Sequence, residues 1–314
     1  MNPALNEETE HDLPGEVPPG HRSGFVAVVG QPNVGKSTLV NMLVGQKIAI
    51  VSPKPQTTRR RIMGILTRED AQVIFVDTPG LHRPRHRLGE AMVETAARAI
   101  PDSDIILFVV DVSALPDEQD RAAAALVRQG GPAILVLNKM DRLPPERVDL
   151  HCRAYWELLP EHVGWMMTIA TEGVNLDRLL AMVIAHLPEG PRYYPGSQVT
   201  DQTEREIVAE LIREQALRFT HQEVPHALAV VVEEYQEREN GAVYIAANLF
   251  VERESQKGIL IGKKGDMLRR IGTEARREIE RMVDGPVFLD LWVKVSKNWR
   301  QDARQVRRMG YGSD

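Results

Sequence analysis

Residues 30–37 read Gly30-Gln31-Pro32-Asn33-Val34-Gly35-Lys36-Ser37. An apolar run typical of a β-strand precedes it, and a run typical of a helix, opened by Thr38, follows it. The spacing G-x-x-x-x-G-K-S between a strand and a helix is that of a loop that binds a nucleoside triphosphate. Glycine lets backbone N–H groups turn onto phosphate oxygens, and the helix start adds partial positive charge.

Two side chains of this loop have predicted roles. Lys36 can reach the outer phosphates as a point charge, and the Ser37 hydroxyl can ligate Mg²⁺. We expect residues 30–38 to form the triphosphate site together. The alternative is a glycine-rich turn that binds nothing, which the flanking strand and helix disfavour.

Length and composition limit the classes of protein. With 314 residues, of which 43% are apolar and 26% charged, the chain has room for two globular domains. Cys152 is the only cysteine, which excludes an intramolecular disulfide and a cysteine-built zinc site and fits the reducing cytoplasm. We find no signal peptide and no apolar run of about 18 residues. Weak peripheral association with the inner face of the cell membrane stays open.

The net charge of −5 conceals an asymmetry. Residues 257–308 contain fourteen Lys and Arg against seven Asp and Glu, so the rest of the chain is strongly acidic. A basic segment on an acidic protein indicates a local site for a polyanion. The alternative is an ordinary solvated helix face.

The first two thirds of the chain alternate between strand-like and helix-like runs. Residues 1–22 are rich in Pro, Glu and Gly and are predicted to be a disordered tail. From 23 to 187, the alternation predicts an α/β domain with a mostly parallel six-stranded sheet and helices on both faces. The strands expected after 25–29 are 62–66, 73–77, 105–110, 133–137 and 165–170. Ligands of such sheets bind beyond the carboxyl ends of the strands.

A second domain is predicted after a linker at 188–200, which is rich in Pro and Gly. It covers 201–314 and is expected to be a compact α+β module. Its expected elements are a helix at 203–219, strands at 227–235 and 243–252, helices near 258–271 and 274–283, a strand at 287–295 and a basic helix near 302–309.

The run Asp77-Thr78-Pro79-Gly80 ends the third predicted strand. A carboxylate at Asp77 can hold Mg²⁺ through water, and the Gly80 N–H can face the γ-phosphate. D-x-x-G is a weak pattern by itself, but its place at a strand end, after the phosphate loop, makes it specific.

The run Asn138-Lys139-Met140-Asp141 follows the fifth strand. Asp141 can accept two hydrogen bonds from guanine, and an unpaired carboxylate there would reject adenine. Asn138 can brace the loop or reach the base, and the Lys139 stem can cover the ring. The backbone N–H of Ala170 can meet guanine O6. An ordinary helix cap at Asp141 is the alternative.

The loop Gln56-Thr57-Thr58-Arg59-Arg60 is predicted to be a switch. A threonine in it can join the Mg²⁺ shell only when a γ-phosphate is present. Thr58 is the predicted ligand and Thr57 the alternative, so the expected metal site consists of Ser37, Thr58 and Asp77.

The basic segment contains the run Ile259-Leu260-Ile261-Gly262-Lys263-Lys264-Gly265. I-G-x-x-G between two helices resembles the loop of a KH domain, where glycines let the backbone approach single-stranded RNA. Lys263 and Lys264 supply positive charge, Ile259 and Ile261 can form a floor under the bases, and Arg269 follows in the next helix. Arg304 and Arg307 in the last helix can extend the RNA face, or that helix can simply pack on Trp292 or Trp299.

These motifs together resemble the Era family of translation-associated GTPases. The forms G-x-P-N-V-G-K-S, Q-T-T-R and D-T-P-G-L carry the resemblance in the first domain. Phe250–Lys257, Ile271–Arg276 and Leu291–Val295 carry it in the second, and it covers roughly residues 23 to 311. It implies slow GTP hydrolysis, a type II KH domain, and binding to small-subunit ribosomal RNA near its 3′ end during 30S maturation. A monomer is expected.

Two residues depart from common GTPase patterns. Ile169 stands where the family usually has serine. Leu81 stands where Ras-like enzymes carry a water-positioning glutamine, and the Era family shares this apolar residue. The resemblance implies that Asn33 helps to hold K⁺ in place of an arginine finger. Lys36, Thr58, Gly80 and Asn33 are therefore the predicted catalytic set.

Three alternatives remain at this point. They are a double-GTPase assembly factor of the Der type, an RNA-binding module whose nucleotide is only structural, and a P-loop ATPase. One set of nucleotide motifs disfavours the first, and Asp141 disfavours the last.

Overall fold

The computed structural model describes residues 17–311, apart from Pro55 and Arg85. Most of the predicted tail, residues 1–16, lies outside the described residues. The described residues divide into two compact units. The first contains 17–49, 58–83 and 93–201, and the second contains 50–57, 84–92 and 202–311.

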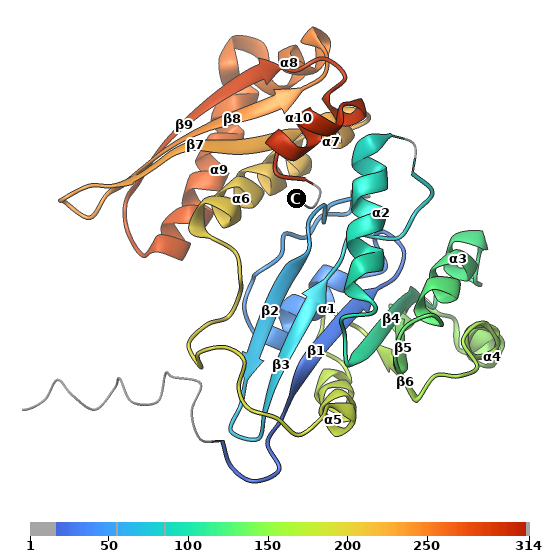
Figure 1. Ribbon diagram of the computed structural model, residues 1–314. Coiled ribbons are helices and arrows are strands. Elements are labelled where there is room, and N and C mark those ends of the chain that lie inside the picture. The colour runs from blue at the N-terminus through green and yellow to red at the C-terminus, as the bar shows by residue number, and fades with distance from the viewer. Residues whose placement is uncertain (1–16, 55, 85, 312–314) are drawn as a thin grey trace, which may run out of the picture. The chain divides into compact units, whose positions relative to one another are not determined.

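The first unit is built on a six-stranded sheet (Figure 1). Its strands are β1 (Arg22–Val29), β2 (Ile62–Thr67), β3 (Ala71–Asp77), β4 (Ile105–Asp111), β5 (Ala133–Asn138) and β6 (Gly164–Thr168). Their spatial order is β2-β3-β1-β4-β5-β6, and β2 alone pairs antiparallel. The predicted mostly parallel sheet is therefore confirmed.

Helices cover both faces of this sheet, as predicted. Two helices, α1 (Lys36–Val44) and α5 (Leu176–His186), pack with one face in a single apolar cluster. The opposite face packs against α2 (Arg87–Ala99), α3 (Glu118–Val127) and α4 (Val148–Leu158). Burial on both faces explains the near-continuous apolar strands, because a strand covered on both sides has no polar alternation.

Residues 188–201, most of them predicted to be a linker, are hydrogen-bonded along the first unit. The Ile65 N–H donates to the Val199 carbonyl at 2.9 Å, and the Met63 N–H donates to Asp201 at 3.0 Å. The Gln72 amide donates to the Tyr194 carbonyl at 2.8 Å. This segment therefore covers backbone groups of β2, an edge strand that would otherwise be open.

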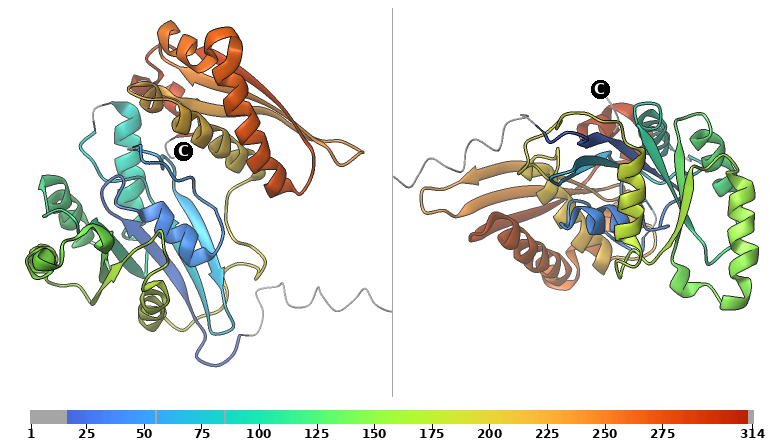
Figure 2. Two further views of the ribbon diagram at one scale, coloured as in Figure 1. Left: turned by 180° about the vertical axis from the view of Figure 1, so that it is seen from behind. Right: turned by 90° about the horizontal axis from the view of Figure 1, so that it is seen from below.

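The second unit has the predicted order of helix, two strands, two helices and a strand. Its elements are α6 (Glu204–Phe219), α7 (Val224–Ala227), β7 (Ala229–Glu237), β8 (Val243–Val251), α8 (Glu254–Ile261), α9 (Asp266–Val283), β9 (Val287–Val295) and α10 (Ala303–Arg308). The sheet order is β7-β8-β9, with an antiparallel first pair and a parallel second pair. Figure 2, from behind, shows α6 and α9 lying across one face of this sheet, where their apolar residues form one cluster with the strands.

The predicted helix boundaries near the second loop are wrong. The first helix ends at Ile261, and α9 runs without a break from Asp266 to Val283, across the expected gap near residues 272–273. Gly262 and Gly265 have φ values of +72° and +83°, which end one helix and precede the next. Gly272 lies inside α9 and does not interrupt it.

None of the helices among residues 17–311, with their two gaps, is long and apolar enough to span a membrane.

Candidate nucleotide and RNA sites

Close packing requires glycine at two positions of the first loop. A Cβ on Gly30 would lie 2.1 Å from the Val109 carbonyl oxygen, and one on Gly35 would lie 2.3 Å from the Asn138 amide. Both residues have positive φ, +155° and +105°. The loop between β1 and α1 therefore packs tightly against β4 and β5, and this packing fixes the shape of the loop.

Lys36 is held inside this loop and is only 5% exposed. Its ammonium group donates to the carbonyls of Gly30 and Gln31 at 3.1 and 2.8 Å. Burial lowers the pKa of Lys36 to about 8, although the charge of Asp77 opposes this. The buried ammonium is thus supported by neutral carbonyls and one carboxylate, an arrangement that favours an arriving anion.

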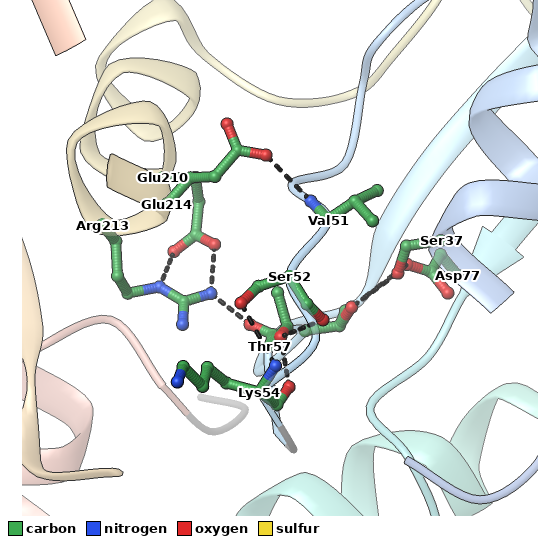
Figure 3. Close-up of polar contacts among 10 residues, drawn as sticks. Ser37, Val51, Ser52, Lys54, Thr57, Asp77, Glu210, Arg213 and Glu214 are labelled. Atoms are coloured by element: carbon green, nitrogen blue, oxygen red, sulfur yellow. Dashed lines mark hydrogen bonds and ion pairs between the residues drawn. The ribbon is translucent and has the colours of Figure 1, made fainter. Parts of the chain in front are cut away.

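The three residues predicted to hold the metal lie together. The Ser37 hydroxyl donates to Asp77 Oδ2 at 2.6 Å and lies 2.7 Å from the Thr58 hydroxyl. Figure 3 shows the Ser37 and Asp77 side chains pointing at each other. They come from the start of α1 and the end of β3, and Thr58 comes from the loop before β2.

Asp77 has the features of a ligand for a hard cation. Its side chain is fully buried, and Oδ1 has no hydrogen-bond partner. Burial raises the pKa of Asp77 to about 6, against the lowering effect of the Lys36 charge. An unpaired oxygen on a buried carboxylate, next to two hydroxyls, fits the oxygen donors that Mg²⁺ prefers.

The two threonines of the switch loop differ in what they contact. The Thr57 hydroxyl donates to the Lys54 carbonyl at 2.7 Å, within its own loop. The Thr58 hydroxyl lies at Ser37 and 3.4 Å from Asp77 Oδ2. This arrangement favours Thr58 over Thr57 as the metal ligand.

Asn138 braces the loops around the nucleotide-base site. Its amide N–H donates to the Val34 carbonyl at 2.8 Å. Its oxygen accepts from the Thr168 hydroxyl and from the Ala170 N–H, both at 3.0 Å. Of the two predicted roles, bracing is the one that the contacts favour. A guanine O6 would have to share the Ala170 N–H with Asn138.

Lys139 has a partner that the sequence reasoning missed. Its ammonium group pairs with Asp111, the last residue of β4, at 2.7 Å. Although burial opposes the shift, hydrogen bonds from Lys139 and Ser113 lower the pKa of Asp111. The sequence feature that could have indicated Asp111 is its position at the end of a strand, on the edge of the sheet where the other motifs lie. Asp141 is exposed, so the base itself would have to bury the carboxylate that selects it.

Residues 50–57 and helix α6, both in the second unit, are joined through the side chains of Arg213 and Glu214. Arg213 is completely buried and pairs with Glu210 through Nε at 2.9 Å and Nη2 at 2.5 Å. The same Nη2 donates to the Thr57 carbonyl, and the Val51 N–H donates to Glu214 at 3.0 Å (Figure 3). No sequence motif marked Arg213, because its partner in the loop is a backbone group.

The turn after β3 approaches the phosphate loop closely. A Cβ on Gly80 would lie 2.5 Å from the Pro32 nitrogen. The Leu81 N–H donates to the Gly30 carbonyl at 3.0 Å, and the Leu81 side chain is buried. A buried, apolar Leu81 has no group that could orient water. Asn33 is exposed and has a φ of +64°.

The loop at residues 262–265 has free space beside it, whereas the loop at residues 30–37 is closely packed. Nothing lies within 4 Å of a Cβ on Gly265, whereas one on Gly262 would lie 2.7 Å from Met267. Lys263, Lys264 and Ile259 are exposed, and Ile261 is half-buried. Arg269 is exposed and pairs with Asp266 at 2.8 Å. This surface offers free space and positive charge to an extended phosphate backbone.

The last helix combines both of its predicted properties. Val306 and Met309 pack in a cluster with the fully buried Trp299, whose indole N–H donates to the Ala227 carbonyl at 2.8 Å. Trp292 is exposed and lies outside that cluster. Arg304 and Arg307 face solvent, so packing on Trp299 leaves them available to RNA.

Family models match both units. A model described as "50S ribosome-binding GTPase" matches residues 25–139, and a model described as "KH domain" matches residues 223–300. The chain is also similar over most of its length to proteins named GTPase Era. It is 47% identical over 294 residues to the one from Heliobacterium modesticaldum, covering 92% of this chain and 97% of that protein. It is 48% identical over 299 residues to the one from Synechocystis, covering 94% of each.

Two solved structures resemble the chain across both units. One is Era in complex with MgGDPNP and nucleotides 1506–1542 of 16S ribosomal RNA, with a TM-score of 0.90 and 38% identity. The other is a variant of Aquifex aeolicus Era bound to GDP and AlF₄⁻, with a TM-score of 0.89 and 38% identity. Each comparison covers 93% of this chain and 100% of the other.

Proposed function

The chain belongs to the Era family of GTPases, and we propose that it is a GTP-controlled switch that binds small-subunit ribosomal RNA near the 3′ end and assists 30S maturation in the cytoplasm. It hydrolyses GTP to GDP and phosphate, which disfavours a purely structural nucleotide. Similarity over nearly the full length of proteins named GTPase Era likewise disfavours a Der-type protein.

The juxtaposition of Ser37, Thr58 and Asp77 carries the nucleotide part of the proposal. Asp77 Oδ1 is buried without a partner, as expected for a carboxylate that meets a cation. When bound, Mg²⁺ would neutralise charge on the β- and γ-phosphates. Lys36 would move from its loop carbonyls to the outer phosphates, Gly80 would donate its N–H to the γ-phosphate, and residues 30–38 would enclose the chain of phosphates.

Base recognition is proposed to depend on three residues. Asp141 would accept from guanine, the Ala170 N–H would approach O6, and Lys139, paired with Asp111 at 2.7 Å, would lay its stem over the ring. Asn138 holds the two loops in register through Val34 and Ala170. Guanine would offer two donors to Asp141, whereas adenine would leave this carboxylate without donors.

The RNA part rests on the open loop at residues 262–265. The space beside Gly265 admits a sugar–phosphate backbone, and Lys263 and Lys264 supply charge. Ile259 and Ile261 would lie under bases, while Arg269, Arg304 and Arg307 would contact phosphates. The matching KH model and the RNA complex of a similar Era support this assignment.

The test is RNA binding in each nucleotide state. We expect tighter binding to an RNA of the 16S 3′ end with a non-hydrolysable GTP analogue than with GDP, measured by fluorescence anisotropy. A scrambled RNA of equal length is the control. Equal affinity with and without nucleotide would contradict the coupling, and equal affinity for the scrambled RNA would contradict the assignment of the RNA.

K⁺ stimulation of hydrolysis is proposed for the same site. Leu81 is buried and cannot orient water, so turnover would depend on stabilising the charge that develops on the phosphates, the role of an arginine finger. Asn33 is exposed in the phosphate loop, and Gly80 packs closely against Pro32 of the same loop. Asn33 would help to hold the ion. We expect faster turnover in K⁺ than in Na⁺ and loss of that difference in Asn33→Ala. Equal turnover in both salts would refute the idea.

The remaining expectations concern assembly and location. We propose a monomer, because one chain carries a nucleotide site and an RNA loop, and analytical ultracentrifugation tests this. Weak association with a membrane surface stays a prediction, and flotation with anionic vesicles tests it.

A further inference from the structure

Two segments next to the nucleotide motifs belong to the second unit. Residues 50–57 directly precede Thr58, and residues 84–92 follow the D-T-P-G turn. In the second segment, Leu88 and Met92 are completely buried in the cluster that contains Trp299 and Tyr311. Both segments are thus structural parts of the RNA-binding unit, although the first leads directly into Thr58 and the second begins four residues after Gly80.

The first segment is attached to α6 by backbone-directed hydrogen bonds. Arg213 donates to the Thr57 carbonyl, and Glu214 accepts from the Val51 N–H at 3.0 Å. The loop contributes one acceptor, the Thr57 carbonyl, and one donor, the Val51 N–H. Both are main-chain groups, so these two hydrogen bonds control the path of the backbone. Figure 3 shows them converging on the loop from one face of α6.

The burial of Arg213 needs an explanation beyond packing. Its side chain is completely buried, and Nη1 has no hydrogen-bond partner. Burying a paired charge stabilises a fold no better than apolar residues of similar volume do in many proteins. The rigid guanidinium fork can, however, hold a carboxylate and a carbonyl oxygen at once in fixed directions. The fork here holds Glu210 and Thr57 in this way.

The carbonyl that Arg213 holds belongs to the peptide bond leading into Thr58. Because a peptide unit is planar, fixing the Thr57 oxygen also fixes the direction of the Thr58 N–H. The next rotatable bonds are those of Thr58 itself, whose hydroxyl lies 2.7 Å from that of Ser37. One arginine is therefore a single peptide plane away from the predicted metal-binding threonine.

We propose that Arg213 is a positioning residue for GTP hydrolysis, which orients Thr58 by holding the Thr57 carbonyl. The inference rests on the proposed role of Thr58 as a metal ligand. If Thr58 moved to ligate Mg²⁺, the same peptide plane would act on Arg213 and hence on α6 of the RNA-binding unit. Such coupling is reciprocal, so a change at α6 also alters the affinity for GTP.

The decisive variant is Arg213→Met with Glu210→Gln, which removes the fork together with the charge of the carboxylate that it holds. We expect kcat for GTP hydrolysis to fall about tenfold or more, the loss expected for one charge-assisted hydrogen bond. The Mg²⁺ concentration for half-maximal hydrolysis should rise. GDP affinity should stay within about twofold, because Thr58 joins the metal only when a γ-phosphate is present. Arg213→Lys keeps one donor and should recover part of kcat.

Controls separate positioning from folding and from the proposed function. Arg205→Met removes an exposed arginine of the same helix and should leave kcat unchanged. Circular dichroism melting checks that each variant is folded. An unchanged kcat in the folded double variant would overturn the proposal, and so would an equal loss of GTP and GDP affinity. A Thr58→Val variant with normal kcat would instead refute the metal assignment. None of these assays contains RNA, so their outcome does not depend on the proposed RNA binding.

Discussion

Two loops of this protein combine glycines with lysine and are proposed to bind phosphate, yet they differ in packing and in exposure. In the loop at residues 30–37, Lys36 is 5% exposed and bonded to loop carbonyls. In the loop at residues 262–265, both lysines are exposed. A Cβ on Gly35 would collide with Asn138, whereas one on Gly265 would meet nothing within 4 Å.

The difference separates two ways of binding phosphate. A closed loop with a desolvated lysine fits one small ligand, and its interactions are strong because water is excluded. An open loop with solvated lysines accepts any stretch of a polymer backbone, gains little from each contact and responds to salt. The first arrangement suits selection and hydrolysis of a nucleotide, and the second suits reversible RNA binding.

The largest expected effect is that of Lys36→Ala. Two or more charge-assisted hydrogen bonds to phosphate are lost, each worth about 1.5–3 kcal/mol, so GTP affinity should fall roughly a thousandfold. Titration with a fluorescent GTP analogue measures it, with the exposed Lys47→Ala as control. A loss below tenfold would mean that the closed loop is not the phosphate site.

Asp141→Asn should exchange the base preference. The amide cannot accept both guanine hydrogen bonds but can donate to the 2-oxo group of xanthine. GTP affinity should fall about a hundredfold and xanthosine triphosphate affinity should rise. Competition titrations with both nucleotides measure the ratio. If the ratio does not move, Asp141 does not contact the base.

Alanine substitutions at the two glycines compare the loops directly. Gly35→Ala should lower the free energy of unfolding by about 2–4 kcal/mol, because left-handed strain adds to displacement of the Asn138 amide. Gly265→Ala has only the left-handed strain, about 1–2 kcal/mol. Urea unfolding without nucleotide measures both. Equal losses would show that the closed loop can relax.

The smallest expected effect concerns the open loop. Lys263→Ala with Lys264→Ala should weaken RNA binding less than about tenfold, since exposed charge pairs contribute little each. The slope of log affinity against log salt should become shallower by about 0.7 for each lysine. Anisotropy titrations over a salt series measure it, and GTP affinity of the same variant should not change. An unaltered slope would place the phosphates elsewhere.

Much of the fold follows from the sequence because its signals are local. A strand, a glycine-rich loop and a helix stand next to each other at residues 25–44, and each later motif stands at the end of an apolar strand. The six-stranded sheet and the order of the second unit follow from the same periodicity. The expected helix break near residues 272–273 is wrong because packing of Ile271, Ala275 and Ile279 in the apolar cluster keeps α9 continuous.

The sequence alone predicts the chemistry of the site, that is, a lysine for the phosphates, a serine and a carboxylate for the metal and an aspartate for the base. The contacts in the folded chain were needed to show which of two adjacent threonines faces Ser37, that Asn138 braces loops, and that Asp111 holds Lys139. They also show that Arg213 holds the backbone before Thr58. The physical reason is range, because motifs are read between neighbours in the chain, whereas these contacts join residues far apart in it, often through backbone groups that leave no trace in residue type.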